Sequence, residues 1–490
     1  MEVSGSSPAN LARVGRRRSL PLRMWVAALV AGAVPGLVLS VRDAPDVDLW
    51  LHLRIGDLLR AGERFGPQPD PLTALADRPY VPTQWLAQLL MSWVHDVGGI
   101  AAIQTVRLLL VVALGAVIAT ACRSLVGPTA ALCGSALSMF AASASWGERP
   151  QLAAMVLLAI VTALWWRASE LGTVPWACVP VVWVWTMVHG SWILGLAVQG
   201  VLLVGGLLDG CWSGRARLLA ASVPGLGLGV ALLTPLGISA VVEPFNVSSV
   251  ARLTANEWQR PSAGNPLLLV LLVGCVIALL GLLRSSRRRW TRALTVVVAA
   301  GLGLWMVRTI AVGAVVLAPA VAVGMTGLLG RRRRAHTEAQ RGETRVPAAR
   351  ASGEVAAWVL ALVVALGLGA LHLTRGIGEP PVSSTVSQTL SNLPPQAVLA
   401  VDGRAVGWTE WAHPDRRPLR DLRAEVYSLP VATAYEGFQE ARPGWQDYAT
   451  EHGVTAVLAD RRRPLDAALA REPAWTVAAE DPDFRLWVLR

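Results

Sequence analysis

The feature that most constrains this chain is a series of eleven apolar stretches, each a candidate membrane-spanning helix. A helix needs about 20 mostly apolar residues to cross the hydrocarbon core, with a lower limit near 17. Only 16% of the 490 residues are charged, whereas about a quarter are charged in soluble proteins. The sequence therefore predicts a polytopic membrane protein, all-α in its membrane part. The candidate spans are 24–41, 99–122, 127–145, 151–167, 175–189, 191–209, 218–240, 265–283, 293–308, 309–329 and 353–373.

The arginines predict how these spans are threaded. Basic residues accumulate in cytoplasmic loops, and loops with arginine clusters alternate here with loops that lack them. This alternation predicts a plasma-membrane protein with its N-terminus in the cytoplasm and its C-terminal region outside. It also explains the net charge of +11 without a nucleic-acid partner. The cytoplasmic arginines are Arg13, Arg16, Arg17, Arg18, Arg23, Arg123, Arg167, Arg215, Arg217, Arg284, Arg287, Arg288, Arg289, Arg292 and Arg331 to Arg334.

Composition divides the chain into five parts. We predict a basic cytoplasmic N-terminus (1–23), a transmembrane core (24–330) with a long outer loop (42–98), a cytoplasmic linker (331–352), a last span (353–373) and an outer C-terminal part (374–490). The C-terminal part is polar and alternates short β-rich runs with helical ones, which predicts a small extracytoplasmic α/β domain. The β-rich runs are 397–402, 454–459, 475–478 and 484–489, and the helical runs are 445–452 and 464–471.

The outer loop 42–98 has three predicted sections. Residues 48–59 form an amphipathic helix with Leu49, His52, Leu53 and Gly56 along one side. The stretch 62–82 contains five prolines and is a loop. Residues 84–97 are too short to cross the bilayer and carry tryptophans, so this segment is expected to lie along the membrane.

The densest group of ionisable residues follows the first span. Asp46 and Asp48 stand two residues apart, and His52 comes one helical turn after Asp48. Two neighbouring carboxylates can bind a divalent cation, or one can act as a general base that the other orients. Other interpretations remain open: ordinary loop acids at both positions, a helix N-cap at Asp48, and an interfacial histidine at His52.

The order of motifs around this group resembles membrane glycosyltransferases of the GT-C class. Those enzymes take a sugar from a polyprenyl-phosphate carrier at the outer face. The chain is most similar to a bacterial set of glycosyltransferase-like membrane proteins, but it has Met187 and Gln84 where that set often has Asn and Glu. The matching motifs are Asp46-x-Asp48-x-Trp50-x-His52, Gly56, Pro69-Asp70-Pro71, Gln84-Trp85-Leu86, Glu148-Arg149-Pro150-Gln151, Trp185-x-x-x-His189-Gly190 with Gly195, Asn256-Glu257-Trp258-Gln259-Arg260-Pro261, Val401-Asp402-Gly403-Arg404 and the stretch from Trp475.

The resemblance implies roles for the acidic group. Asp48 is the predicted general base, because a partly buried carboxylate can accept a proton from an acceptor hydroxyl. Asp46 would support Asp48 or, with it, bind Mg²⁺ or Mn²⁺. His52 would hydrogen-bond the donor phosphate or orient an aspartate.

Arg149 and Arg308 lie in outward segments, against the positive-inside bias. A guanidinium matches a phosphate with two parallel hydrogen bonds, so either could hold the phosphate of the carrier. The alternative for Arg149 is an ion pair with Glu148 or contact with lipid headgroups. His189, Glu257 and Trp258 are further candidate binding residues, with an interfacial histidine and an interfacial tryptophan as alternatives. Asp402 to Arg404 are expected to form a turn after a strand.

The sequence thus favours an inverting glycosyltransferase. Its partners would be a polyprenyl-phosphate sugar donor, an extracytoplasmic glycan, lipid or protein as acceptor, and membrane lipids. A non-catalytic membrane scaffold for the cell envelope is the main alternative, and a transporter is less favoured because no midspan acid pair is present. An enzyme requires Asp46, Asp48, His52, His189, Glu257 and Arg308 to converge on one cavity, whereas a scaffold would leave them scattered.

Overall fold

The computed structural model describes residues 46–63, 65–66, 69–246, 248–284, 288–328 and 380–490. The predicted first and last spans, the basic N-terminus and the linker 331–352 lie outside these residues. Each of the other nine predicted spans coincides with a helix. The helices are α3 (Trp85–Leu125), α4 (Pro128–Ala141), α5 (Pro150–Leu171), α6 (Cys178–Val188), α7 (Trp192–Leu208), α8 (Gly214–Ala231), α11 (Pro266–Arg284), α12 (Arg289–Trp305) and α13 (Thr309–Leu328).

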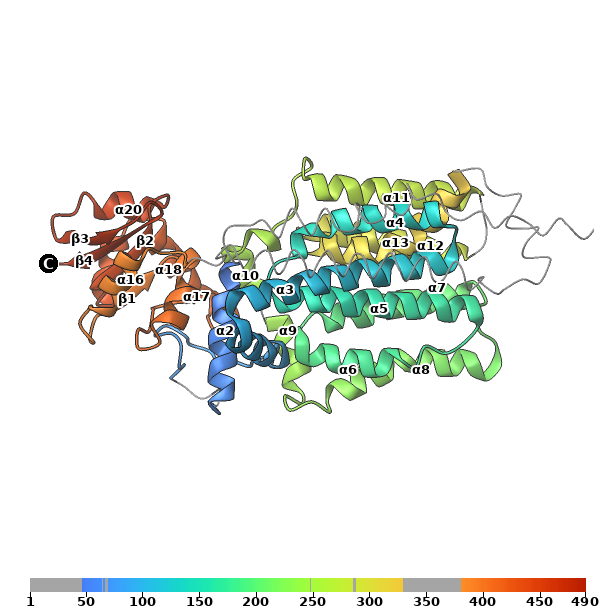
Figure 1. Ribbon diagram of the computed structural model, residues 1–490, viewed down its shortest axis with the longest axis horizontal. Helices are drawn as coiled ribbons and strands as arrows, with labels where there is room; N and C mark the ends of the chain where they lie inside the picture. Colours follow the sequence, from blue (N-terminus) through green and yellow to red (C-terminus); the bar gives the residue numbers. More distant parts are fainter. Residues whose placement is uncertain (1–45, 64, 67–68, 247, 285–287, 329–379) are drawn as a thin grey trace, which may run out of the picture.

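Four of these helices, α3, α5, α11 and α13, are long and apolar enough to cross a membrane. Helices α4, α6 and α7 are apolar but have only 14, 11 and 17 residues. The polytopic helical membrane fold is therefore confirmed, whereas the number of complete crossings stays a prediction. In Figure 1 the long helices run side by side along the molecule, with α6 and α8 along one edge.

The predicted C-terminal end of one span is wrong. The stretch 218–240 was expected to be continuous, but α8 ends at Ala231 and a series of turns follows. Pro235 lies in these turns, and the residue before a proline is disfavoured in helical geometry. The chain resumes as α9 (Ser239–Asn246), α10 (Ser248–Thr254) and the 3₁₀ helix η3 (Asn256–Trp258), so the outward loop around 243–265 is largely helical.

Helix α13 lies at the centre of the helical part. It packs against α4, α11 and α12, and 83% of its span is buried. At the crossing of α11 and α13, a Cβ built on Gly281 would lie 2.4 Å from the Cα of Gly324. Glycines permit this approach because small residues let helix backbones touch, which is the usual source of helix association within membranes.

The C-terminal residues form a four-stranded sheet with helices around it. All four β-rich runs are strands, in the order β1-β2-β4-β3, with β1 parallel to β2 and the other pairs antiparallel. Both predicted helical runs are helices as well, α19 and α20. The elements are β1 (Leu399–Val401), β2 (Ala456–Asp460), β3 (Trp475–Glu480), β4 (Phe484–Leu489), α16 (Ser384–Ser391), α17 (Gly403–Ala412), α18 (Leu429–Gln439), α19 (Trp445–Glu451) and α20 (Pro464–Leu469).

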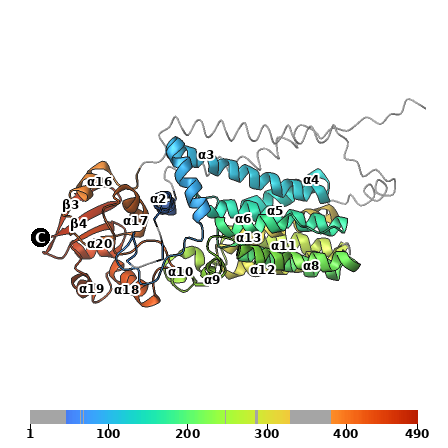
Figure 2. The ribbon, with the colours of Figure 1, turned by 90° about the horizontal axis from the view of Figure 1, so that it is seen from below.

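Helix α2 (Val47–Arg60) lies where the C-terminal part meets the membrane helices (Figures 1 and 2). The helix itself is confirmed, but its predicted amphipathic character is wrong. Trp50, Leu51 and Ile55 lie outside the predicted apolar side of the helix, but they are buried too. Helix α3 covers one face of α2 and α17 covers another. The contact with α17 is close: a Cβ on Gly407 would lie 3.2 Å from backbone atoms of α2.

The proline-rich loop is also tied to the C-terminal part. Arg423 donates to both carboxylate oxygens of Asp70, at 2.9 and 2.6 Å, and its Nε donates to Asp421 at 2.5 Å. All three side chains are at most 3% exposed. The motif Pro69-Asp70-Pro71 therefore has a structural role, because removing one partner of a buried pair leaves an uncompensated charge.

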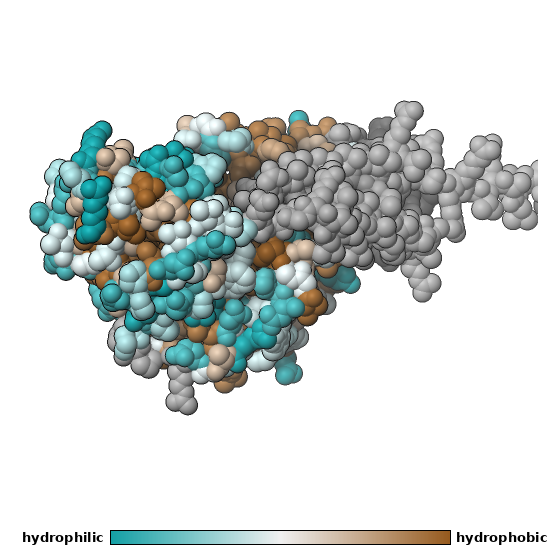
Figure 3. Space-filling view, turned by 60° about the vertical axis from the view of Figure 1, so that its left-hand side comes forward, coloured by the Kyte–Doolittle hydropathy of each residue, from teal (hydrophilic) through white to brown (hydrophobic). Residues whose placement is uncertain are grey.

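The segment expected to lie along the membrane is the first part of α3. Gly98 and Gly99 have non-helical dihedral angles, with φ of +63° at Gly99, and they bend the helix there. Figure 2 shows this first section running at an angle to the rest of α3. The face of the C-terminal part seen in Figure 3 is mainly hydrophilic, in contrast to the exposed leucines and valines on α8, α11 and α12.

Candidate functional site

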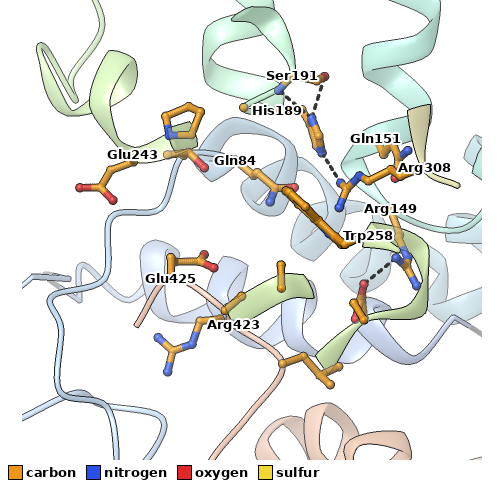
Figure 4. A pocket seen from close by; sticks show the side chains of 18 of the residues that line it. Gln84, Arg149, Gln151, His189, Ser191, Glu243, Trp258, Arg308, Arg423 and Glu425 are labelled. Carbon is orange, nitrogen blue, oxygen red and sulfur yellow. Dashed lines mark hydrogen bonds and ion pairs between the residues drawn. The ribbon is translucent and has the colours of Figure 1, made fainter. Parts of the chain in front are cut away.

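A cavity of about 470 Å³ opens where α2, the helix ends and the C-terminal part meet. Six of the candidate residues line it: Asp48, His52, Arg149, His189, Trp258 and Arg308. They come from positions up to 260 residues apart in the sequence. Figure 4 shows Arg149 and Arg308 at one side, with Glu243 and Glu425 at the other. Apolar residues from several helices complete the wall: Met155, Ile193, Leu194, Phe245, Trp305, Met306 and Val312.

The two aspartates have different roles at the start of α2. Asp46 is the N-cap, and its Oδ1 accepts from the backbone N–H of Asp48 at 3.1 Å. The N-cap alternative for Asp48 is therefore wrong, because Asp48 lies in the first turn and its carboxylate lines the cavity. Asp46 does not line the cavity. Its carboxylate instead fixes the first turn of α2, in which Asp48 lies.

The backbone of Asp46 is held by a buried acid. Glu148 Oε2 accepts from the N–H of Asp46 at 3.1 Å, while its Oε1 accepts from Gln104 at 2.7 Å and from Arg107 at 2.5 Å. Arg107 and Glu148 are 4% and 2% exposed. The expected alternative of an Arg149–Glu148 pair is therefore wrong, since Glu148 faces inward to α3.

Arg149 contacts three carboxylates instead. Its Nε donates to Asp46 Oδ2 at 2.8 Å, and its Nη1 lies 3.0 Å from Asp48 Oδ2 and 3.3 Å from Glu257 Oε2. Burial disfavours the charge, but Asp48, Asp46 and Glu257 raise the pKa of Arg149. Its position as the residue before Pro150 at the start of α5 fixes an extended backbone that aims the side chain at α2.

Arg308 is the second cation of the site. Its Nη1 donates to Glu257 Oε1 at 3.0 Å, and its Nη2 lies 3.1 Å from His189 Nε2. On the other side of the ring, His189 Nδ1 accepts from the backbone N–H of Ser191 at 3.0 Å and lies 2.8 Å from Ser191 Oγ, so the imidazole is neutral. The Trp258 ring lies against the guanidinium, with its centroid 5.5 Å from the carbon Cζ.

His52 lies one turn after Asp48, and its side chain is buried. Burial, together with the nearby charges of Arg149 and Arg308, lowers the pKa of His52 to about 4, so the imidazole is neutral at physiological pH. Its Nδ1 is 3.3 Å from Gln88 Nε2. Since an amide nitrogen only donates, Nδ1 accepts and the ring proton is on Nε2. His52 is therefore a hydrogen-bond donor.

Asp48 has the altered pKa expected of a base. Burial raises the pKa of Asp48 from 3.8 to about 6; Arg149 opposes this shift, and Asp46 and Glu257 add to it. A general base works best when its pKa is close to the operating pH. Asp48 thus combines position in the cavity with a suitable proton affinity.

Sequence reasoning missed several residues of the cavity wall. Gln88, Glu243, Arg252, Arg423 and Glu425 all line it. Burial raises the pKa of Glu425, which comes from the loop before α18. Gln88 could have been found as a polar residue in an otherwise apolar stretch, but no local signal marks the segment that contains Glu425.

One motif lies apart from this site. Asp402 caps α17 by accepting from the N–H of Arg404 at 2.9 Å, and Arg404 pairs with Asp460 at 2.6 Å. Neither residue lines the cavity. The expected strand before this motif is present, but the expected turn is wrong, because Asp402 is the N-cap of α17 and Gly403 and Arg404 are its first residues.

The predicted metal ligands do not fit a divalent cation as they are placed. Both oxygens of Asp46 are used, by the Asp48 N–H and by Arg149, and one oxygen of Asp48 contacts Arg149. Within the described residues, no group of three His, Cys, Asp or Glu side chains is arranged to hold a metal. The guanidinium of Arg149 occupies the position between the carboxylates.

Comparison with known proteins gives the fold. No family model and no curated protein matches the sequence. The oligosaccharyltransferase AglB from Archaeoglobus fulgidus, in complex with an inhibitory peptide and a dolichol-phosphate, matches with a TM-score of 0.54 and 14% identity. The match covers 89% of this chain and 69% of AglB.

Two further structures also match. AglB in complex with Zn and sulfate has a TM-score of 0.54 at 12% identity, over 88% of this chain and 68% of AglB. ArnT from Cupriavidus metallidurans, bound to undecaprenyl phosphate, has a TM-score of 0.48 at 17% identity, over 95% and 97% of the two chains. The AglB match confirms the expectation drawn from the motifs around Asp48: this chain has the fold of the GT-C membrane glycosyltransferases.

Proposed function

We propose that this protein is an inverting glycosyltransferase that moves a sugar from a polyprenyl-phosphate carrier to an extracytoplasmic glycan, lipid or protein. The observation that supports this most is the convergence of Asp48, His52, Arg149 and Arg308 on one cavity. AglB, which has the same fold, is bound in its structure to a dolichol-phosphate, and this favours a carrier of that class.

In this proposal the two arginines bind the donor phosphate. Glu257 now links them, with one oxygen on Arg308 and the other on Arg149. Two phosphate oxygens can make the same pair of contacts, because carboxylate and phosphate both match guanidinium donors. His52 donates its Nε2 proton to the same phosphate.

Asp48 then acts on the acceptor. Its carboxylate takes the proton of the acceptor hydroxyl as the new bond from that oxygen to the anomeric carbon forms. The bond from the anomeric carbon to the phosphate oxygen breaks, and the electron pair leaves with the phosphate. Arg149 and Arg308 stabilise the developing charge, an effect that usually contributes most to such a reaction.

The two substrates are proposed to enter from different sides. The apolar wall residues from α7, α12 and α13, such as Leu194, Trp305 and Val312, suit an isoprenoid chain that arrives through the membrane. Residues 422–425 of the C-terminal part line the same cavity, and the acceptor would enter beside them. This arrangement requires the predicted topology of eleven spans with the C-terminal part outside.

Asp48, His52, His189 and Arg308 line this cavity, and Asp46 and Glu257 contact it through Arg149; a scaffold protein has no need for this arrangement. The test is a transfer assay with the purified full chain and a panel of polyprenyl-phosphate sugars, read by mass spectrometry of the carrier. Release of sugar by the wild type and its loss in Asp48→Asn would support the proposal. Absence of transfer and of binding to every donor in the panel would contradict it.

A further inference from the structure

Arg149 lies between three carboxylates that come from different parts of the chain. Asp46 and Asp48 belong to the start of α2, Glu257 belongs to η3, and Arg149 itself immediately precedes α5. The three contacts are 2.8, 3.0 and 3.3 Å. Three carboxylates that meet at one point normally need a cation between them, because their mutual repulsion would otherwise separate them.

The three carboxylates offer the type of ligand that a divalent cation prefers, although as placed within the described residues they do not form a metal site. Mg²⁺ and Mn²⁺ prefer carboxylate oxygens. In this chain, however, both oxygens of Asp46 and both oxygens of Glu257 already accept hydrogen bonds. An ion could coordinate these oxygens only if Arg149 moved away and left its charge without partners, which is costly in a partly buried position.

The two arginines offset two of the three negative charges of the cluster without an ion. Asp46, Asp48 and Glu257 contribute three negative charges, and Arg149 and Arg308 contribute two positive ones, so the sum is −1. A donor phosphate that displaces Glu257 would still meet two guanidinium groups. Within the described residues, Arg149 Nη2 makes no hydrogen bond, and this leaves a donor for that phosphate.

We propose that Arg149 takes the place of a divalent cation, so that this protein binds the donor phosphate and transfers the sugar without a metal. The proposal rests on the function proposed above. Its two parts are that the guanidinium holds Asp46, Asp48 and Glu257 together, and that it supplies, with Arg308, the positive charge for the leaving phosphate. A guanidinium can do both because it is always protonated and has five donors.

Binding of Mn²⁺ tests the first part without any need for transfer activity. The free-ion signal in electron paramagnetic resonance would be followed as wild-type full chain, stripped of metal, is titrated. We expect no site of submillimolar affinity in the wild type. Arg149→Ala opens the three-carboxylate group, and we expect it to bind one Mn²⁺ at least about tenfold more tightly than the wild type.

Arg252→Ala is the matched control, because Arg252 also lines the cavity but makes no contact with the three carboxylates within the described residues. It removes the same charge without opening the cluster and should not gain the site. Equal gains in both variants would overturn the proposal. So would a wild-type Mn²⁺ site that Asp48→Asn removes, and this result stands even if Arg149→Ala fails to fold.

Transfer assays test the second part. Chelation with EDTA followed by dialysis should leave the rate of the wild type unchanged within about twofold, and a loss that Mn²⁺ restores would overturn the proposal. If no sugar is transferred at all, the proposed function fails, while the Mn²⁺ titration still decides whether Arg149 occupies the cation position. The two failures are therefore distinguishable.

Discussion

The proton affinity of Asp48 gives the sharpest prediction. Its pKa is about 6, so roughly a tenth of the carboxyl groups are ionised at pH 5 and roughly nine tenths at pH 7. If Asp48 must be ionised to act as the base, the transfer rate should rise about tenfold between these two values. Asp48→Asn keeps the size of the side chain but cannot accept the proton, and should lower the rate by about 10² to 10⁴.

The assay is transfer of a labelled sugar at saturating donor, measured from pH 4.5 to 8. Asp57→Asn is the matched control, because Asp57 lies on the same helix and bonds Ser92 rather than the cavity residues. It should keep the rate and the pH profile of the wild type. A flat wild-type profile across this range, or a wild-type rate in Asp48→Asn, would refute the reasoning.

The same shift predicts how pH affects unfolding. The Asp48 pKa is raised in the folded state, from 3.8 to about 6, so the folded protein binds this proton more tightly than the unfolded chain. The associated stability is fully present below pH 3.8 and is lost as the pH rises through about 6. In thermal unfolding, Asp48→Asn should flatten this part of the pH dependence.

Three other predictions concern binding and packing. Arg308→Gln removes the charged hydrogen bonds that we propose hold the donor phosphate, each of which contributes about 1.5–3 kcal/mol, so binding of undecaprenyl phosphate should weaken roughly 10- to 100-fold in a titration of intrinsic tryptophan fluorescence. Gly56→Ala places a Cβ 2.3 Å from the carbonyl oxygen of Gln88 and should cost about 1–3 kcal/mol of stability in thermal unfolding. Arg423→Met removes the guanidinium that pairs with the buried carboxylates of Asp70 and Asp421 and should cost about 3–5 kcal/mol in the same assay.

Each of these variants has a matched control. Arg252→Gln removes a cation from the same cavity and should retain most of the affinity for undecaprenyl phosphate. A Cβ on Gly200 of α7 meets nothing within 4 Å, so Gly200→Ala should not destabilise the protein. Arg462 is 62% exposed, and Arg462→Met should cost less than about 1 kcal/mol. Equal effects in a variant and its control would contradict the structural explanation.

Much of the fold could be predicted because it depends on local patterns. Apolar runs of sufficient length indicate helices regardless of their neighbours, and nine such runs are helices here. The four strands of the C-terminal part were recognisable from short β-rich runs. Helix ends were less accurate, as at Ala231, where α8 ends although apolar residues continue after it.

The candidate site was predictable in part. Asp48, Arg149 and Arg308 could be named because charged residues near a membrane are costly and rare. The sequence could not indicate that Arg149 reaches Glu257, which is 108 positions away, or that Glu425 would line the same cavity. Local sequence patterns predict where helices and strands form and which face of a helix is apolar. They do not predict which distant elements pack together.

By itself, then, the sequence determined the membrane helices, the sheet of the C-terminal part and the identity of most chemically active residues. Tertiary structure alone decided that Asp46 caps α2 while Asp48 faces the cavity, and that an arginine lies where a metal ion was expected. The physical reason is that hydropathy and turn preferences are properties of neighbouring residues. Burial and ion pairing depend instead on segments that come together only when the chain is folded.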